Sequence, residues 1–443
     1  MYGGDGVKVS GKPLRVAQLG CGVVGSQVAR LLTTQADELA TRIGRPLELV
    51  GIAVHDITKP RPGLDPALFT DDAEGLASRE DVDIVLELIG GVDPAEGLLR
   101  KAIAHGASIV TANKLLLASR AGQIFEAADE AGVDLYFEAA VAGAIPIVRP
   151  LRESLVGDEI TTIMGIVNGT TNFILDKMTL DGMSFSEGLR LAQEAGYAEA
   201  DPTADVEGFD AAAKAAILAR LAFHSPVTVD QVYREGITNL TTDDIKAAAE
   251  ANCVIKLLAI AEVLPNGSVS VRVHPAMVPQ EHPLAGVHGA YNAIYVLSRQ
   301  AGRLMFLGPG AGGVPTASAV IGDLVTVARN RDQGIAGPSH TVEMMRPVAS
   351  DKEAMTRYHL RFRVVDAPGV LANVATIFAN RQVSVSNVRQ TRPYIMDDES
   401  RWSAELHLQT HPATEADLQM CVAELIASPV VGGAPHTLRM EGM

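Results

Sequence analysis

Apolar runs and segments of helical period alternate along the first part of the chain. Residues 14–19 are a short apolar run that predicts a buried strand, and four similar runs follow at intervals that leave room for helices. Strands that alternate with helices form a parallel sheet covered by helices on both faces. We therefore expect residues 1–150 to form an α/β, doubly wound Rossmann domain, with its other strands within 47–56, 83–91, 107–114 and 133–143.

A glycine-rich turn follows the first predicted strand. It reads G-x-G-x-x-G, and a helical pattern begins directly after it. In such a turn the first glycine makes the bend, the second lets the backbone reach a pyrophosphate, and the third lets helix and strand pack closely. The helix N-terminus then faces the phosphates. We expect a dinucleotide to bind here, at Gly20, Gly22, Val23, Val24 and Gly25.

The end of the second predicted strand bears on the choice between NAD and NADP. Asp56 stands near the place where an acid binds the adenosine ribose of NAD, but Lys59 and Arg61 follow it. Basic side chains here can meet the 2′-phosphate of NADP, or they can belong to a solvated loop. We expect NADP, with NAD as the alternative.

Polar and glycine residues also stand at the ends of the later strands. Ligands bind at the carboxyl ends of strands in a doubly wound sheet. Lys114 begins a predicted helix, where the helix dipole disfavours a cation. We therefore expect a functional role for Lys114, close to the other strand-end residues Ile89, Gly90, Thr111 and Asn113.

The pattern changes after residue 150. Residues 160–175 predict a strand, the loop Asn-Gly-Thr-Thr-Asn and a helix. The amides and hydroxyls of this loop can bind a small polar ligand, cap the helix, or do both. We expect residues 151–336 to form an α+β substrate-binding domain.

One helix of this region carries charges on its apolar side. Asp210, Lys214, Ile217 and Leu221 share one face at the helical period. On an exposed helix such an Asp–Lys pair stabilises by only about 0.2–0.5 kcal/mol. On a stripe that must be buried, the two charges are costly unless they face a pocket. We expect them to form part of a catalytic constellation.

The C-terminal part has a pattern of its own. Residues 337–356 are polar, contain prolines and predict a linker. Residues 357–443 predict strand–helix–strand–strand–helix–strand, which is the ferredoxin-like order.

Composition narrows the class of partner. A chain of 443 residues suggests two or three domains, and its net charge of −16 argues against nucleic acid or an anionic membrane as a partner. It has no apolar run long enough to span a membrane and no signal-like N-terminus. Three widely spaced cysteines suit a reducing compartment. We expect a cytoplasmic protein that acts on small molecules.

Several motifs together resemble the homoserine dehydrogenase family. The pattern AxxxGYAxxDPxxDVxGxDxxxK at 192–214 is similar to the signature of that family. TANK (111–114), GIVNGTTN (165–172) and GPGAGGVPTASAV (308–320) resemble other blocks of it. The resemblance implies NAD(P)H-dependent, reversible reduction of L-aspartate 4-semialdehyde to L-homoserine, on the branch toward threonine, methionine and isoleucine.

The resemblance also implies roles for single residues. Lys114 and Lys214 correspond to catalytic lysines, with Lys214 as the proton donor to the aldehyde oxygen. Glu199, Asp210 and the nearby Asp205 would hold the amino end of the substrate. Residues of the loop, such as Asn168 and Thr170, would join Lys114 at the substrate carboxylate, and Gly196 and Gly312 would close on the cofactor.

Two further sites follow from resemblance. EAAVAGAI (138–145) is similar to a site for sodium or another monovalent cation, with ligands from Glu138, Val141, Gly143 and Ile145, mostly through backbone oxygens. DAPGVLA (366–372) resembles the first turn of an ACT domain. It implies feedback inhibition by threonine bound near Asp366, Gly369 and Val370 between two such domains, whereas the alternative is a domain that only assembles subunits.

Two other classes of protein share part of this pattern. Another ACT-bearing NAD(P) dehydrogenase, such as a 3-phosphoglycerate dehydrogenase, would need an arginine, histidine and glutamate set that we do not find. A non-catalytic sensor of NADP and an amino acid would need neither Lys114 nor Lys214. The family resemblance further implies a homodimer or homotetramer, with a substrate-domain sheet shared in the dimer.

Overall fold

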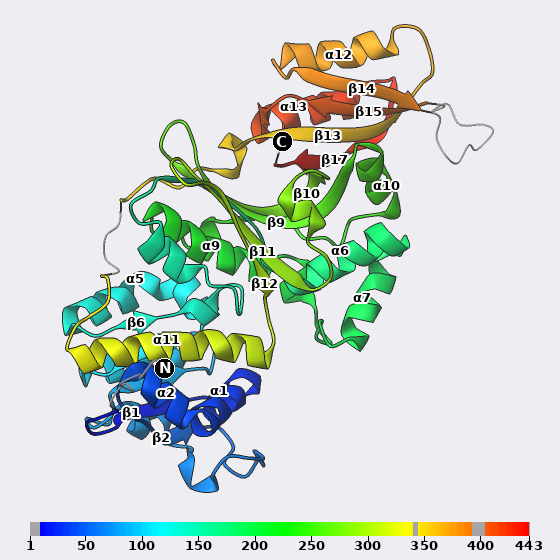
Figure 1. The fold of residues 1–443 in the computed structure, drawn as a ribbon. Coiled ribbons are helices and arrows are strands. Elements are labelled where there is room, and N and C mark those ends of the chain that lie inside the picture. The colour runs from blue at the N-terminus through cyan, green and yellow to red at the C-terminus, as the bar shows by residue number, and fades with distance from the viewer. Residues whose placement is uncertain (1–8, 340–343, 392–403, 443) are drawn as a thin grey trace, which may run out of the picture.

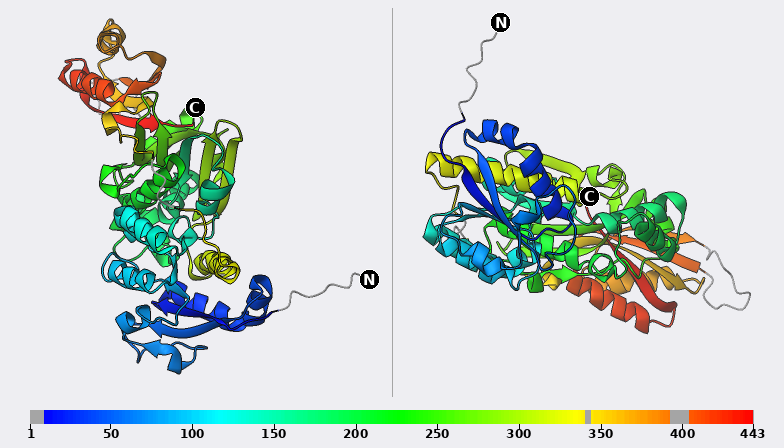
Figure 2. Two further views of the ribbon diagram at one scale, coloured as in Figure 1. Left: turned by 90° about the vertical axis from the view of Figure 1, so that its left-hand side faces the viewer. Right: turned by 90° about the horizontal axis from the view of Figure 1, so that it is seen from below.

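The computed structural model describes residues 9–339, 344–391 and 404–442. An N-terminal unit and a C-terminal unit lie at opposite ends of the molecule, with a central unit between them (Figure 1). The left-hand view of Figure 2 shows the same order. The three cysteines are free thiols. Within the described ranges, no helix combines the length and the apolar character that crossing a bilayer requires.

The N-terminal unit is built on a parallel sheet in the order β3-β2-β1-β4-β5-β6. This is the order of a dinucleotide-binding sheet, and it confirms the Rossmann class expected from the sequence. The order reverses between β1 and β4, which places a ligand crevice at the carboxyl ends of these two strands. The strands are β1 (Leu14–Leu19), β2 (Leu47–Ala53), β3 (Phe69–Thr70), β4 (Ile84–Glu87), β5 (Ser108–Thr111) and β6 (Leu135–Tyr136).

Helices cover both faces of this sheet. One face packs on α1 (Val23–Thr34), α2 (Ala36–Ile43) and α11 (Gly313–Gln333), and the other packs on α3 (Ala73–Ala77), α4 (Ala95–Ala104) and α5 (Lys114–Ala131). Leu14 and Ile84 share one hydrophobic core with Val320 and Leu324 of α11. Helix α11 therefore packs on the N-terminal sheet, although its sequence lies within 151–336.

The last strand of this sheet, β6, is much shorter than the run 133–143 suggests. The backbone N–H of Glu138 donates to Asp323 Oδ2 at 2.7 Å instead of to a neighbouring strand. The Glu138 carboxylate accepts the backbone N–H groups of Ile147, Val148 and Arg149. Because these contacts bend the chain back on itself, the segment continues as the single-turn helix η2 (Glu138–Ala140).

A second, mixed sheet runs from the central unit into the C-terminal unit without a break. Its main path is β12-β11-β7-β9-β10-β17-β13-β15-β14. The join is a parallel pairing of β10 with β17, at Ala276–Arg439 and Met277–Met440. The strands of the central unit are β7 (Ile160–Ile166), β8 (Tyr233–Arg234), which pairs with β10, β9 (Cys253–Val263), β10 (Val269–Pro279), β11 (Tyr291–Ser298) and β12 (Gly302–Pro309).

The C-terminal unit confirms the expected ferredoxin-like order. Its two helices pack against each other and share one hydrophobic core with the strands. In chain order the elements are β13 (Met355–Val364), α12 (Val370–Asn380), β14 (Val385–Thr391), β15 (Ala404–Thr410), the short β16 (Ala413–Thr414), α13 (Glu415–Ala427) and β17 (Val431–Met440).

The remaining helices belong to the central unit. They are α6 (Gly169–Asp181), α7 (Phe185–Glu194), α8 (Thr203–Val206), α9 (Phe209–Phe223) and α10 (Thr242–Glu250), and single-turn helices connect several of the elements. Part of the segment predicted as a linker runs beside β10, because the N–H of Val269 donates to Pro347 O at 2.8 Å and that of Ala349 donates to Val269 O at 2.9 Å.

Candidate active site

Helix α9 carries two charged side chains into the interior. Asp210 is 8% exposed and Lys214 is 9% exposed, so the expected inward orientation of the pair is confirmed. The helix packs against β9, β10 and α5. It is also buried more completely than a single apolar stripe suggests, because Arg220 alone escapes full burial between residues 210 and 223. The alanines that surround Lys214 allow this close packing on every side.

Two lysines share the carboxylate of Asp210. Lys214 Nζ donates to Asp210 Oδ2 at 2.7 Å and to the backbone oxygen of Val167 at 2.7 Å. Lys114, the first residue of α5, makes an ion pair with Asp210 Oδ1. Lys114 belongs to the N-terminal unit and Lys214 to the central unit. The site therefore lies where the two units meet.

The charges around Asp210 keep it ionised. Burial alone would raise the pKa of its carboxyl group, but the positive charges of Lys214 and Lys114 and their hydrogen bonds outweigh the burial. The net effect holds the pKa of Asp210 far below its ordinary value. The Asp210 carboxylate is therefore ionised at neutral pH.

The loop after β7 reaches the same place. Asn168 Oδ1 accepts the N–H of Thr171 at 2.9 Å, which caps α6, while Asn168 Nδ2 donates to Asp205 Oδ1 at 2.7 Å and Asp210 Oδ2 at 3.0 Å. Asn168 thus caps α6 and also donates to two acids of the site. Thr170 is buried, and its hydroxyl donates to Tyr197 O at 2.7 Å, which ties α6 to the chain after α7.

Of the two remaining predicted carboxylates, Asp205 contacts this cluster. Asp205, in α8, is half-buried and keeps one oxygen outside the Asn168 contact. Glu199 is exposed, and its backbone oxygen accepts from Gln193 Nε2 at 3.2 Å. Gly196 has φ +76°, and a Cβ there would meet open space. The structure therefore brings Asn168, Asp205, Asp210, Lys114 and Lys214 together, and the contacts that join these five residues do not include Glu199 or Gly196.

The glycine turn between β1 and α1 has the geometry of a dinucleotide site. A Cβ on Gly20, which has φ +97°, would lie 2.6 Å from Leu88 O, and one on Gly25 would lie 2.5 Å from Gly20 O. A Cβ on Gly22 would meet no protein atom within 4 Å. The first and third glycines are therefore required by the protein itself, whereas the second leaves a space into which a pyrophosphate fits. Val23, at the start of α1, is 75% exposed, and Val24 follows it in the first turn.

A second helix begins beside this turn. Gly312, with φ +113°, precedes α11. A Cβ on Gly313 would lie 3.0 Å from both Val23 Cγ1 and Val23 O. The N-termini of α1 and α11 therefore meet, and each carries partial positive charge that favours an anionic group. This contact supports the predicted place of Gly312 near a cofactor.

A buried glutamate that the sequence analysis did not single out orders the ends of β4 and β5. Glu87 accepts the N–H groups of Ile89 and Gly90 at 2.9 and 3.1 Å, and the Thr111 hydroxyl at 2.5 Å. The side chain of Thr111 thus points at Glu87, so only its backbone is free to face a ligand. Asn113 caps α5 and donates to Gly91 O at 2.6 Å. A carboxylate inside the apolar run 83–91 was the available signal for Glu87.

The loop after β2 separates its two basic residues. Arg61 Nη1 donates to the backbone oxygens of Asp56 and Lys59 at 3.0 Å each, and its guanidinium lies over the Phe69 ring. Asp56 accepts from the N–H and hydroxyl of Thr58 at 2.8 and 2.6 Å, and these bonds lower the pKa of its carboxyl. Arg61 and Asp56 therefore shape the loop, whereas Lys59 is exposed.

The segment 138–145 is buried around a bend. The Glu138 carboxylate is engaged by the N–H groups of residues 147–149, so backbone oxygens are what this segment can offer a cation. Gly143, with φ +59°, packs so closely that a Cβ would lie 2.6 Å from Gly310 O. Val141 and Ile145 are buried. Among the described residues, histidine, cysteine and acidic side chains form no cluster of three that could hold a metal.

The predicted effector residues lie between β13 and α12. Asp366 Oδ1 accepts from Gln390 Nε2 at 3.1 Å. Gly369 has φ +90° and precedes α12, and Val370 is buried as the first residue of that helix. The turn is placed at the surface of the C-terminal unit, where a second copy could approach it.

Comparisons with known proteins agree with one another. Models described as homoserine dehydrogenase, homoserine dehydrogenase NAD binding domain, and ACT domain match residues 146–325, 20–138 and 358–398. The homoserine dehydrogenase of Corynebacterium glutamicum is 52% identical over 438 residues, 98% of this chain and 97% of that protein. That of Mycobacterium tuberculosis is 52% identical over 435 residues, 97% of this chain and 98% of that protein.

Solved structures give the same picture. The crystal structure of a homoserine dehydrogenase from Thiobacillus denitrificans is similar with a TM-score of 0.90 and 38% identity, over 97% of this chain and 98% of that one. A hyperthermophilic archaeal homoserine dehydrogenase in complex with NADPH is similar with a TM-score of 0.60 and 26% identity, over 71% of this chain and 98% of that one.

Proposed function

Because the chain belongs to the homoserine dehydrogenase family, and is thus an NAD(P)-dependent oxidoreductase with a C-terminal ACT domain, we propose a role for each group of its active site. The reaction is the reversible reduction of L-aspartate 4-semialdehyde to L-homoserine. The observation that carries the proposal is the Asp210 carboxylate shared by Lys114 and Lys214 at the junction of the two units.

Lys214 is the proton donor in our proposal. A lysine ammonium has three N–H bonds. Two of them are used by Asp210 and the backbone oxygen of Val167, which leaves one for the substrate oxygen. As the carbonyl oxygen gains negative charge, the ammonium group stabilises it and then transfers a proton from Nζ. In the reverse direction the same nitrogen takes the proton of the homoserine hydroxyl.

The bound nicotinamide cofactor supplies or accepts the hydride, and the chain supplies its binding site. The open space at Gly22 supports a pyrophosphate bound at the glycine turn and the N-terminus of α1. We infer NADP as the preferred cofactor because Lys59 is free to meet a 2′-phosphate, while Arg61 is engaged by its own loop. Gly90, Gly196 and Gly312 would line the same crevice.

Charged groups at the junction suit an amino-acid substrate. The ammonium group of Lys114, whose side chain is 41% exposed, can reach a substrate carboxylate as well as Asp210. Both oxygens of Asp210 are engaged by protein groups, so we assign it chiefly to holding the two lysines. We propose that Asp205 and Glu199 bind the substrate ammonium. Asp205 has one oxygen outside its contact with Asn168, and Glu199 is exposed.

A monovalent cation such as sodium is the ligand we propose for the bend at 138–145. Glu138, Val141, Gly143 and Ile145 would contribute backbone oxygens, since the Glu138 carboxylate is already engaged. The bend follows β6 and packs against Gly310, so a cation there would stiffen this contact. Activity measured in sodium and in tetramethylammonium buffers tests this: equal activity in both counts against the proposal.

Threonine is the effector we propose for the ACT domain, bound near Asp366, Gly369 and Val370 in a dimer or tetramer. The surface position of this turn supports the proposal. Removing the whole domain is an unsuitable test, because β17 pairs with β10 in the central sheet. The better test is threonine titration of Asp366→Asn. Unchanged inhibition by threonine, or no inhibition of the parent chain, would count against this site.

The catalytic proposal is tested by homoserine-dependent reduction of NADP by the purified full chain. We expect turnover with homoserine and none with 3-phosphoglycerate, whose 2-hydroxy acid requires a different set of groups. Binding of NADP without turnover would instead support a sensor.

The free thiols of all three cysteines suit the reducing cytoplasm, which we propose as the location.

A further inference from the structure

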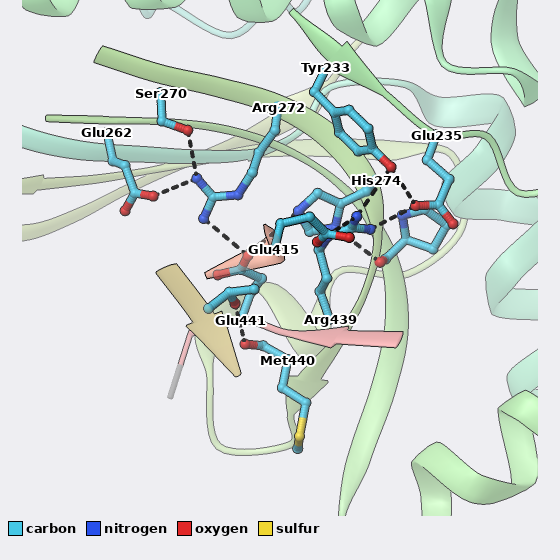
Figure 3. A network of polar contacts seen from close by, with 12 residues as sticks. Tyr233, Glu235, Glu262, Ser270, Arg272, His274, Glu415, Arg439, Met440 and Glu441 are labelled. Atoms are coloured by element: carbon cyan, nitrogen blue, oxygen red, sulfur yellow. Dashed lines mark hydrogen bonds and ion pairs between the residues drawn. The ribbon is translucent and has the colours of Figure 1, made fainter. Parts of the chain in front are cut away.

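Charged side chains at the end of the chain lie at the join of the central and C-terminal units, where β17 pairs with β10 (Figure 3). Arg439 and Glu441 approach two separate groups of partners there. Arg272 joins Glu441 to Glu262, with distances of 3.1 Å to Glu441 Oε1 and 2.5 Å to Glu262 Oε1. Arg439 joins a second group, and its partner Glu235 leads toward the active site.

Arg439 uses every nitrogen of its guanidinium. Nη1 donates to Glu235 Oε2 at 2.7 Å, Nη2 donates to the Tyr233 hydroxyl at 3.1 Å, and Nε donates to Glu415 Oε2 at 3.1 Å. The Tyr233 hydroxyl in turn donates to Glu235 Oε2 at 3.3 Å. A planar fork with several donors fixes its partners in a way that a lysine cannot. Arg439 therefore holds α13, through Glu415, and the segment after β8, through Glu235.

The segment held by Glu235 grips the turn between α8 and α9. Arg234 Nη1 donates to Glu207 O at 2.6 Å, and Thr238 Oγ1 donates to Glu207 Oε1 at 2.8 Å. Between them, the N–H of Ile237 donates to Val206 O at 2.8 Å. Gly236 packs directly against Val206, since a Cβ on Gly236 would lie 2.5 Å from Val206 O.

This turn joins the two acids of the site. Asp205 precedes it in α8, and Asp210 follows it in the first turn of α9. Gly208, with φ +78°, makes the bend, and a Cβ there would lie 3.3 Å from Arg234 Cγ. The guanidinium of Arg234 also lies 3.4 Å from the centre of the Phe209 ring. A shift of residues 234–238 would therefore displace Asp205 relative to Asp210.

We propose that Arg439 is a positioning residue for the substrate site: by holding Glu235, it fixes residues 234–238 against the turn that sets the spacing of Asp205 and Asp210. Arg439 lies in the ACT domain, so the same contact links the position of α13 to the spacing of Asp205, the proposed substrate acid, and Asp210, which holds the two lysines. The inference deepens the proposed function and rests on the roles given there to Asp205 and Asp210.

The test compares steady-state kinetics of the full-length Arg439→Met, Glu235→Gln and double variants. We expect the KM for homoserine to rise about threefold to tenfold in each single variant, with the KM for NADP unchanged. The KM of the double variant should not exceed the larger of the two single-variant values, because both substitutions break the same contact between Arg439 and Glu235. Arg439→Lys, which keeps the charge but loses the fork, should give an intermediate KM.

The matched control is Glu441→Gln, which loosens the same strand through the other group of partners. A homoserine KM at the parent value in this variant supports a specific role for Arg439, and a rise as large as that of Arg439→Met would overturn it. If Arg439→Met does not fold, Glu235→Gln decides, because the side chain of Glu235 is 42% exposed. An unchanged KM in that variant would also overturn the inference. Asp205→Asn separates the two proposals, because an unchanged homoserine KM there refutes the proposed substrate acid itself.

Discussion

Lys114 and Asp210 stand 96 positions apart in the sequence, and their side chains form an ion pair. Lys114 begins α5 beneath the ligand crevice of the N-terminal sheet, while Asp210 begins α9 in the central unit. Lys214 reaches the same carboxylate from one helical turn further on. The site is therefore assembled from both units, and neither unit alone holds a complete set of charged groups.

Asp205→Asn and Asp210→Asn should affect different kinetic constants. Asp210 holds both lysines, so we expect its variant to lower kcat by about a hundredfold or more. Asp205 is half-buried and is the residue proposed to bind the substrate ammonium, so its variant should raise the KM for homoserine about tenfold with a smaller effect on kcat. Asp181→Asn is the control, because Asp181 pairs with Lys177 in an exposed part of α6. Equal effects of the two test variants on both constants would contradict the assigned roles.

Gly22→Ala should leave the fold intact and weaken the binding of the cofactor. The added methyl group meets no protein atom within 4 Å, but it occupies the space assigned to the pyrophosphate. We expect the KM for NADP to rise on the order of tenfold at nearly constant thermal stability. Gly97→Ala in α4, which also meets open space, is the matched control and should keep the parent KM. A parent-like KM in Gly22→Ala would place the cofactor elsewhere.

Lys59→Ala should discriminate between the two cofactors. An exposed lysine that meets the 2′-phosphate contributes to NADP binding and not to NAD binding. We expect the KM for NADP to rise about threefold to tenfold while that for NAD stays constant. Arg61→Met should weaken both cofactors, because Arg61 supports the loop backbone. A Lys59→Ala variant that changes neither constant would remove the phosphate contact from the account.

Asp323 should make the stability of the protein depend on pH. Burial raises the pKa of its carboxyl to about 7, against the opposing charge of Arg149, which lies 3.1 Å from Oδ1. The ordinary pKa in an unfolded chain is about 3.9, so between about pH 4 and 7 the folded state binds one proton more than the unfolded state. Stability from this group is thus present below pH 4 and is lost as pH rises to 7.

The slope attributable to Asp323 is at most about 1.4 kcal/mol per pH unit. Urea unfolding of the parent and of Asp323→Asn at pH 5, 6 and 7 measures it. We expect the free energy of unfolding of Asp323→Asn, relative to that of the parent, to increase as the pH rises. Parallel curves would show that Asp323 does not titrate in this range.

Local patterns in the sequence were sufficient for much of the fold. The glycine turn at residues 20–25 has its own steric signature, and the spacing of Asp210 and Lys214 with Ile217 and Leu221 showed which way the charges point. The order of elements after residue 357 gave the ferredoxin-like class. Each of these depends on neighbours within about thirty residues, which is the range that periodicity and turn chemistry report.

Long-range pairing could not be predicted in the same way. In the parallel pairing of β17 with β10, Ala276 and Arg439 are partners although they lie 163 positions apart in the sequence. The packing of α11 on the first sheet likewise depends on residues such as Val320 meeting Leu14. Glu87 escaped notice because a single carboxylate in an apolar strand shows its role only when its partners, Ile89, Gly90 and Thr111, are seen around it.

The most direct test of the account is the kcat of Lys214→Met for homoserine-dependent reduction of NADP. Lys177→Met is the control, because Lys177 forms an Asp–Lys pair of the same i,i+4 spacing on the exposed side of α6. We predict that Lys214→Met folds, binds NADP as the parent does, and loses about a hundredfold to ten-thousandfold in kcat, while the control keeps its activity. A folded Lys214→Met variant with a kcat close to that of the parent would contradict the account.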